Sequence, residues 1–291
     1  MVVLRLMAWV LKHFSRRVDD SWTDLHPYRL VLCLLFFFLQ LAAQETPAPP
    51  ADDVVRHALA DQQRVIDLLD KYTFTKHVTS ESTDGKGKVT GHQERVFNYA
   101  PCGEKTCITL LSVNGAPPKP RELKEHQKAV EKEWEKKAKK STEDRQKEED
   151  DDLFLSKDFL AIYDFSSSGN ELHEGTATQV VAFAPKQETV APADKNNKVL
   201  TKMAGRMWIA EVDRKIVATE MHMVKPIKVW GGFAGAINNM TVRQEYLVDS
   251  NGVYLPKRNA VEMEMRVMLT KIRLNVVEEY SDFKRAEVAV K

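Results

Sequence analysis

The chain has 291 residues, and its 43 Lys and Arg residues nearly balance its 42 Asp and Glu residues, which leaves a net charge of +1. No overall field therefore attracts nucleic acid, and the basic cluster around Lys136 is interleaved with glutamates, so we exclude nucleic acid as a partner. The length accommodates one large domain or two ordinary ones. We expect one domain, because the charged segment 121–152 alone has a linker's composition.

Residues 1–43 read as a secretory signal peptide with an extended leader. The apolar run Leu30–Leu41 is short for a bilayer span and is followed by Ala42-Ala43, which is the order of a cleavable signal. We expect cleavage after Ala43 and a periplasmic mature protein. The alternative is an uncleaved membrane anchor with Arg16-Arg17 left in the cytoplasm. A Pro-rich spacer at 44–53 follows, and the domain itself covers 54–291.

Two cysteines, Cys102 and Cys107, remain in the mature chain. Outside the cytoplasm a nearby pair of this kind favours a disulfide, and no second Cys or His pair with ligand spacing completes a metal site. We expect a disulfide that stiffens a hairpin tip, and no metal ion.

The first elements of the domain are a helix and a meander of three strands. Asp52 or Asp53 is expected to cap a helix that runs through Leu69. The runs 72–78 and 89–99 are rich in β-branched and aromatic residues and flank a Gly-containing turn, which predicts a hairpin. A third strand at 108–113 ends at Asn114-Gly115, and the prolines that follow prevent its continuation.

Segment 121–152 is almost entirely charged, with a narrow apolar stripe at helical spacing. Opposite charges four residues apart support a solvated helix, so we expect an exposed helical insertion. A mobile flap that covers a sheet opening with Trp134 is the alternative. The more apolar stretch 153–165 is predicted as a buried helix ended by 166–170, and 172–183 as a strand.

The stretch 205–285 repeats short alternating runs separated by turn signals, of which Asn251-Gly252 is the strongest. It predicts consecutive antiparallel strands. Val261, Met263 and Met265 alternate with charged residues, and at Thr270 the phase of the alternation flips, which implies a bulge or a very tight turn. We count about nine strands in the whole chain.

Polar residues of these strands give weak signals for chemistry. His222 shares a strand face with Glu220, and Glu262 with Glu264, but neither pair has a third ligand or reacting partner in reach. We therefore expect no enzyme, no catalytic residue and no cofactor. The unusual composition is apolar, because Met-rich surfaces adapt to ligands of variable shape. The candidate cavity residues are Met207, Trp208, Met221, Met223, Met263 and Met265. Methionines that fill an irregular core are the alternative interpretation.

The order of these elements is similar to that of a known family. The entering helix, the meander, the Val113-Asn114-Gly115 stop before a charged helix, the strand Gly205–Asp213 and a last meander ending near Phe283 together resemble the bacterial outer-membrane lipoprotein-sorting superfamily, the LolA-, LolB- and RseB-like periplasmic proteins. The resemblance covers about 53–285. The long charged segment departs from the family, and no functional residue of the sorting factors falls on a matching motif.

The resemblance implies an α+β fold, mainly antiparallel β, in which an incomplete, half-open β-barrel carries helices on its concave face and a long charged helical insertion. It also implies an apolar cavity that holds acyl chains. We therefore predict a monomeric periplasmic carrier or sensor that binds a lipid, an acyl chain or a lipoprotein. The alternative is a non-enzymatic interaction or structural module of the envelope, with a filled core and an envelope protein as its partner.

Overall fold

The computed structural model describes residues 50–103, 105–138, 159–187, 199–229, 235–267 and 270–286. The predicted leader 1–43, the glycine pair at 231–232, and most of the segment 139–165 that we expected to be helical lie outside these residues. Residues from Pro50 onward form one compact unit. Within the described residues, no helix has the length and apolar character that a membrane crossing requires.

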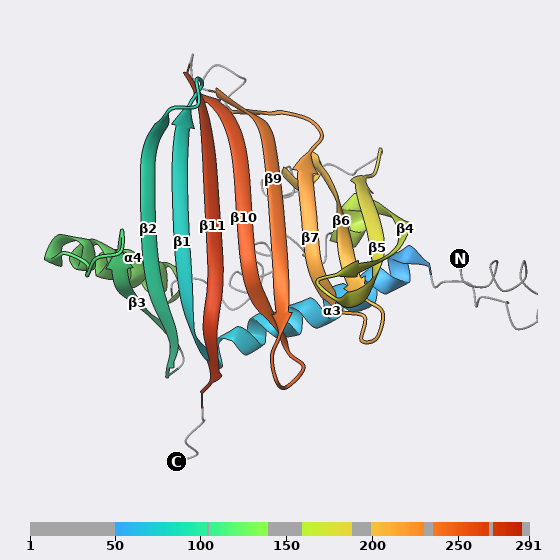
Figure 1. The fold of residues 1–291 in the computed structure, drawn as a ribbon, viewed down its shortest axis with the longest axis horizontal. Helices are drawn as coiled ribbons and strands as arrows, with labels where there is room; N and C mark the ends of the chain where they lie inside the picture. Colours follow the sequence, from blue (N-terminus) through green and yellow to red (C-terminus); the bar gives the residue numbers. More distant parts are fainter. Residues whose placement is uncertain are drawn as a thin grey trace, which may run out of the picture. The chain divides into compact units, whose positions relative to one another are not determined.

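One antiparallel sheet of 11 strands organises the domain (Figure 1). Ten of the strands follow the order β3-β2-β1-β11-β10-β9-β7-β6-β5-β4, and the short β8 pairs with β9. The strands span Tyr72–Asp84 (β1), Val89–Cys102 (β2), Lys105–Val113 (β3), Tyr163–His173 (β4), Thr176–Pro185 (β5), Met203–Ala210 (β6), Ile216–Met223 (β7), Ile227–Val229 (β8), Gly235–Val248 (β9), Tyr254–Val267 (β10) and Thr270–Arg285 (β11). Among the described residues the outermost strands β3 and β4 do not pair, so the sheet is an incomplete barrel, as the family resemblance implied.

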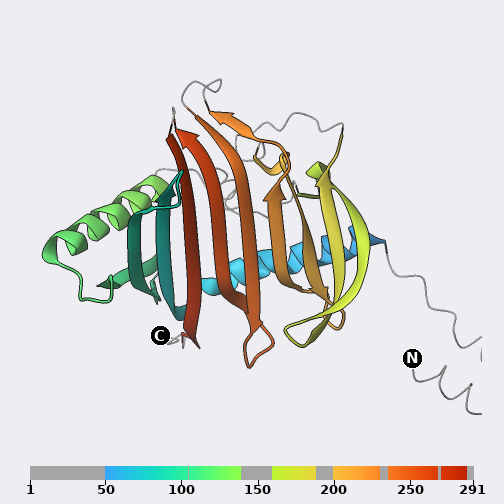
Figure 2. The same cartoon turned by 45° about the horizontal axis from the view of Figure 1, so that its top comes forward.

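Helix α3, Ala51–Leu69, crosses one face of the sheet, which we call the inner face (Figures 1 and 2). Its Val54, Val55, Ala58 and Leu59 recur at helical spacing and are buried. The predicted aspartate cap is wrong, because the helix begins after Pro50 without a side-chain cap. Asp52 and Asp53 instead lie in the first turn, where carboxylates interact favourably with the helix dipole.

The core fills the space between α3 and strands β4 to β9. The side chains of Met207 and Met221 are fully buried there, together with Phe159 and Ile209. Gly205 allows the close approach of β7, because a Cβ at this position would collide with the backbone oxygen of Glu220 and with the ring of Phe183. This half of the inner face is a packed core.

Several expected elements differ from the structure. Tyr163–Phe165 belong to β4 and not to a helix, and only Phe159–Ile162 (α6) are helical among the described residues there. Residues 166–170 continue β4 through a register shift at a positive-φ glycine, Gly169, instead of ending a helix. The strand expected at 172–183 is the end of β4, a turn and β5.

Other expectations are confirmed. β1, β2 and β3 form the predicted meander. The phase flip at Thr270 is a tight turn, because Val267 and Thr270 are paired across β10 and β11. Helix α4, Pro120–Ala138, lies in the charged segment, and it contacts the β2–β3 edge through His126, whose ring lies near Phe97 and whose Nε2 lies 3.0 Å from the Ile108 carbonyl oxygen.

Candidate functional site

The candidate site is a patch of apolar side chains on the inner face of β9, β10 and β11. In antiparallel strands, residues that are directly opposite each other point to the same face. Val261 lies opposite Val242 and Val276, and Met263 lies opposite Met240 and Leu274. A third row continues the pattern. The nine members of this apolar patch are Ile237, Met240, Val242, Val261, Met263, Met265, Ile272, Leu274 and Val276.

Exposure distinguishes the apolar patch from the core beneath α3. Met240 and Val242, the members next to the packed half, are buried. The other seven members are only half-buried. Aliphatic and thioether side chains that remain half-exposed on one continuous surface are typical of contact with an apolar ligand or partner.

The structure separates the six candidate residues named from the sequence. Met207 and Met221 belong to the packed core, and Met223 packs against it while half-buried. Met263 and Met265 lie in the apolar patch, where Met263 also packs against the edge of the core. Trp208 lies on the opposite face, which we call the outer face, where it packs with Val180, Val217 and Tyr254. Its indole Nε1 donates a hydrogen bond to the Glu171 carboxylate.

A row of polar residues borders the apolar patch. The next inner-face row consists of Gln244, Asn259 and Glu278, which are opposite one another. Each lies two residues from the valine of its own strand, Val242, Val261 or Val276. Lys76 and Tyr280 form the adjoining pair on β1 and β11. We call these five residues the polar belt. Sequence reasoning missed the belt, because its members come from four strands and meet only through the pairing of β9 with β10, of β10 with β11 and of β11 with β1.

Hydrogen bonds and charges tie the polar belt together. The Lys76 ammonium lies 2.9 Å from Glu278 Oε1, and the Tyr280 hydroxyl donates to Glu278 Oε2 at 2.6 Å. Asn259 Nδ2 donates to the Tyr280 hydroxyl at 3.2 Å. Lys76 Nζ also lies over the Tyr99 and Tyr280 rings. The belt therefore holds a positive and a negative charge that neutralise each other.

The belt's environment shifts the pKa of each of its titrating groups. Burial raises the pKa of the Glu278 carboxyl, but the Tyr280 hydrogen bond and the Lys76 charge outweigh burial, so the pKa is lowered. Burial lowers the pKa of Lys76, but Tyr99 and the Glu278 carboxylate outweigh it, so this pKa is raised. Burial and the neighbouring carboxylate both raise the pKa of Tyr280. At neutral pH, Lys76 and Glu278 are both charged.

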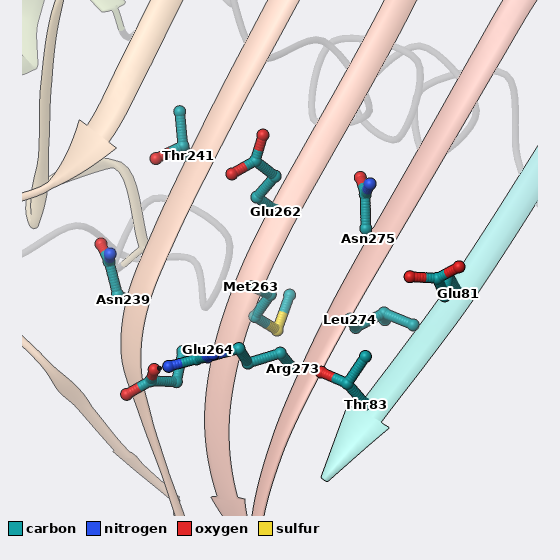
Figure 3. Close-up of a pocket in the computed structure, with 10 residues that line it drawn as sticks. All are labelled: Glu81, Thr83, Asn239, Thr241, Glu262, Met263, Glu264, Arg273, Leu274 and Asn275. Carbon is teal, nitrogen blue, oxygen red and sulfur yellow. Dashed lines mark hydrogen bonds and ion pairs between the residues drawn. The ribbon is translucent and has the colours of Figure 1, made fainter. Parts of the chain in front are cut away.

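The outer face of the same strands carries a shallow polar depression of about 300 Å³ (Figure 3). Its acidic residues have basic partners: Glu264 lies 2.8 Å from Lys271 and 3.2 Å from Arg273, and Arg243 bridges Glu220 and Glu262. Glu220 is therefore paired with Arg243, and the His222 side chain is exposed. Paired charges on a solvated sheet face offer no reacting group, so we place the site on the inner face.

The described residues contain no cluster of three or more His, Cys, Asp or Glu side chains that is suited to a metal ion. Cys102 and Cys107 form the predicted disulfide at the tip of the β2–β3 hairpin, with Cα atoms 5.5 Å apart. The bridge lies at the sheet edge and contributes no residue to the apolar patch.

No protein-family model and no curated protein matches the sequence. Solved structures of the lipoprotein-sorting superfamily are similar to this chain. A LolA superfamily protein from Nitrosomonas europaea is 11% identical with a TM-score of 0.32, and the match covers 83% of this chain and 96% of that protein. A putative outer-membrane lipoprotein-sorting protein domain from Vibrio parahaemolyticus is 10% identical with a TM-score of 0.33, and the match covers 81% of this chain and 95% of that domain.

The complex of MucA and MucB from Pseudomonas aeruginosa is a further match, 8% identical with a TM-score of 0.22, over 82% of this chain and 99% of that one. The family that the sequence resembles is thus present among similar structures. Matches with these identities and TM-scores do not indicate which ligands or partners this chain binds.

Proposed function

We propose that the chain binds a lipid or an acyl chain on its apolar patch and acts as a periplasmic carrier or sensor. The observation that carries the proposal is the half-exposed surface of seven aliphatic and Met side chains on β9, β10 and β11, directly beside a fully packed core. The leader expected from the sequence and the disulfide at Cys102 and Cys107 support an extracytoplasmic location.

The energetics of such a site are favourable without a charged anchor. Each buried methylene group gains about 0.8 kcal/mol. An acyl chain of about a dozen methylenes therefore retains several kcal/mol after the cost of ordering it, which corresponds to an affinity between about millimolar and about micromolar. Unbranched Met side chains such as Met263 and Met265 can adapt to chains of different shape.

A titration with a fluorescent fatty acid tests the proposal. Leu274→Glu places a charge in the middle row of the apolar patch, beside Met263, and should weaken binding by at least about tenfold. Asn275→Glu is the matched control, because Asn275 is the next residue of β11, is exposed and points to the outer face. Circular dichroism establishes that both variants are folded. Equal loss in both variants would contradict a site on the inner face.

A specific observation also favours the second candidate, an envelope interaction module. Met207 and Met221, two of the residues expected to line a cavity, are fully buried in the packed core. Mass spectrometry of organic extracts from the purified protein separates the two functions. A copurified lipid supports the carrier, whereas the absence of both a copurified lipid and fatty-acid binding supports the module.

A further inference from the structure

The polar belt contains hydrogen-bonding groups that the protein does not use. Gln244 Oε1 is buried and has no hydrogen-bond partner. Thr219 Oγ1, opposite Gln244 on β7, is likewise buried without a partner, and the whole Thr219 residue is 2% exposed. Buried polar atoms in folded proteins normally have hydrogen-bond partners, so two neighbouring atoms without one point to a missing group.

The belt also has a defined position relative to the apolar patch. Gln244 is two residues from Val242 on β9, and Asn259 is two residues from Val261 on β10. On the other side of the belt, Phe74, Tyr99 and Phe283 pack as an aromatic cluster. A ligand on the patch therefore reaches the belt with one end only, and that end meets Gln244 and Asn259.

The charge of the belt determines which kind of ligand head group can bind there. Lys76 is neutralised by Glu278 at 2.9 Å, and Arg95, the next charged side chain of the same row, lies two strands beyond Glu278. Among the described side chains of the belt, a lone carboxylate or phosphate would therefore meet no unpaired cation, and a quaternary ammonium would meet no unpaired anion. The unused atom of Gln244 is an acceptor, which requires an N–H or O–H donor.

We propose that the ligand is an amphiphile with an uncharged, hydroxyl- or amide-bearing head, and that this head donates a hydrogen bond to Gln244 beside Thr219 while the tail covers the apolar patch. This inference rests on the proposed function, because it requires a tail on the patch. One O–H group placed between the Gln244 and Thr219 oxygens would satisfy both, because it can donate to Gln244 Oε1 and accept from the Thr219 hydroxyl.

Three amphiphiles with the same tail and different heads test the inference: monomyristoylglycerol, myristate and myristyltrimethylammonium. Each displaces a fluorescent acyl probe from the protein at concentrations below micelle formation. We expect monomyristoylglycerol to bind about tenfold more tightly than the other two. Equal affinities, or the tightest binding by myristate, would overturn the proposal for the head while leaving the acyl site intact. Failure of all three to bind would overturn the proposed function as well.

Two substitutions locate the head. Gln244→Leu removes the acceptor, and Thr219→Val removes the neighbouring hydroxyl with little change of shape. Each should bring the affinity for monomyristoylglycerol down toward that for myristate. Gln93→Leu is the matched control, because Gln93 is an exposed inner-face residue of β2, two strands from the patch. Retained discrimination among the three heads in both folded variants would contradict the assignment. The ranking measured with the unmodified protein remains decisive if a variant does not fold.

Discussion

The two halves of the inner face contain similar residues in different environments. Beneath α3, Met207 and Met221 are completely buried. On β10, Met263 and Met265 share the same face of the same sheet but are half-buried. The difference shows that composition alone does not distinguish a core from a binding surface, because the elements packed over each part of the sheet decide which methionines are covered.

Truncation of one methionine in each half should give the largest contrast in stability. Met207→Ala removes a fully buried side chain and leaves a cavity, so we expect a loss of about 3 kcal/mol in the free energy of unfolding. Met265→Ala should cost less than about 1 kcal/mol, because its side chain is already partly solvated. Urea denaturation followed by circular dichroism measures both. Equal losses would show that the two halves are packed alike.

The polar belt at the border of the apolar patch should contribute a smaller, pH-dependent amount to the free energy of unfolding. Glu278→Gln leaves Lys76 without its carboxylate at 2.9 Å, and we expect a loss of about 2 kcal/mol at neutral pH. The pKa of Glu278 is lowered in the folded protein, so its contribution is present above the unfolded pKa and is lost as the pH falls through the folded value. Between pH 7 and about pH 3, the free energy of unfolding from denaturation curves should therefore fall more steeply for the parent than for the variant. Parallel curves would contradict this role.

Substitutions on the outer face should change stability and binding least. Arg243→Gln removes contacts of 3.2 Å and 3.4 Å to Glu220 and Glu262, but these side chains are substantially exposed. Exposed ion pairs contribute little after solvent screening, so we expect a change below about 1 kcal/mol and unchanged fatty-acid binding. A large loss of binding in this variant would move the site to the outer face.

Local patterns in the sequence predicted the elements whose signals lie within a few residues. Asn251-Gly252 marks the β9–β10 turn, where Gly252 has a φ of 74° and the Asp249 side chain accepts hydrogen bonds from the backbone N–H groups of Asn251 and Val253. The phase flip at Thr270 likewise reported a real turn. The cysteine spacing identified the disulfide correctly.

Long-range pairing determined what the sequence did not predict. The register of Lys76 with Tyr280 joins residues about 200 positions apart, so no local pattern places Lys76 beside Glu278. The sequence placed Met207 and Met221 in one candidate set but gave no information about where α3 lies. The serine-rich run in β4 looked like a helix end because an exposed edge strand with a Gly169 irregularity lacks an apolar alternation.

A photoreactive acyl probe tests the central claim most directly. A fatty acid with a diazirine in its tail is bound to the purified protein and irradiated, and the modified residues are mapped by mass spectrometry. The account predicts adducts on the half-buried members of the apolar patch, such as Met263, Leu274 and Val276, and none on Met207. Adducts confined to the outer face around Glu262 and Arg273, or no saturable adduct at all, would contradict it.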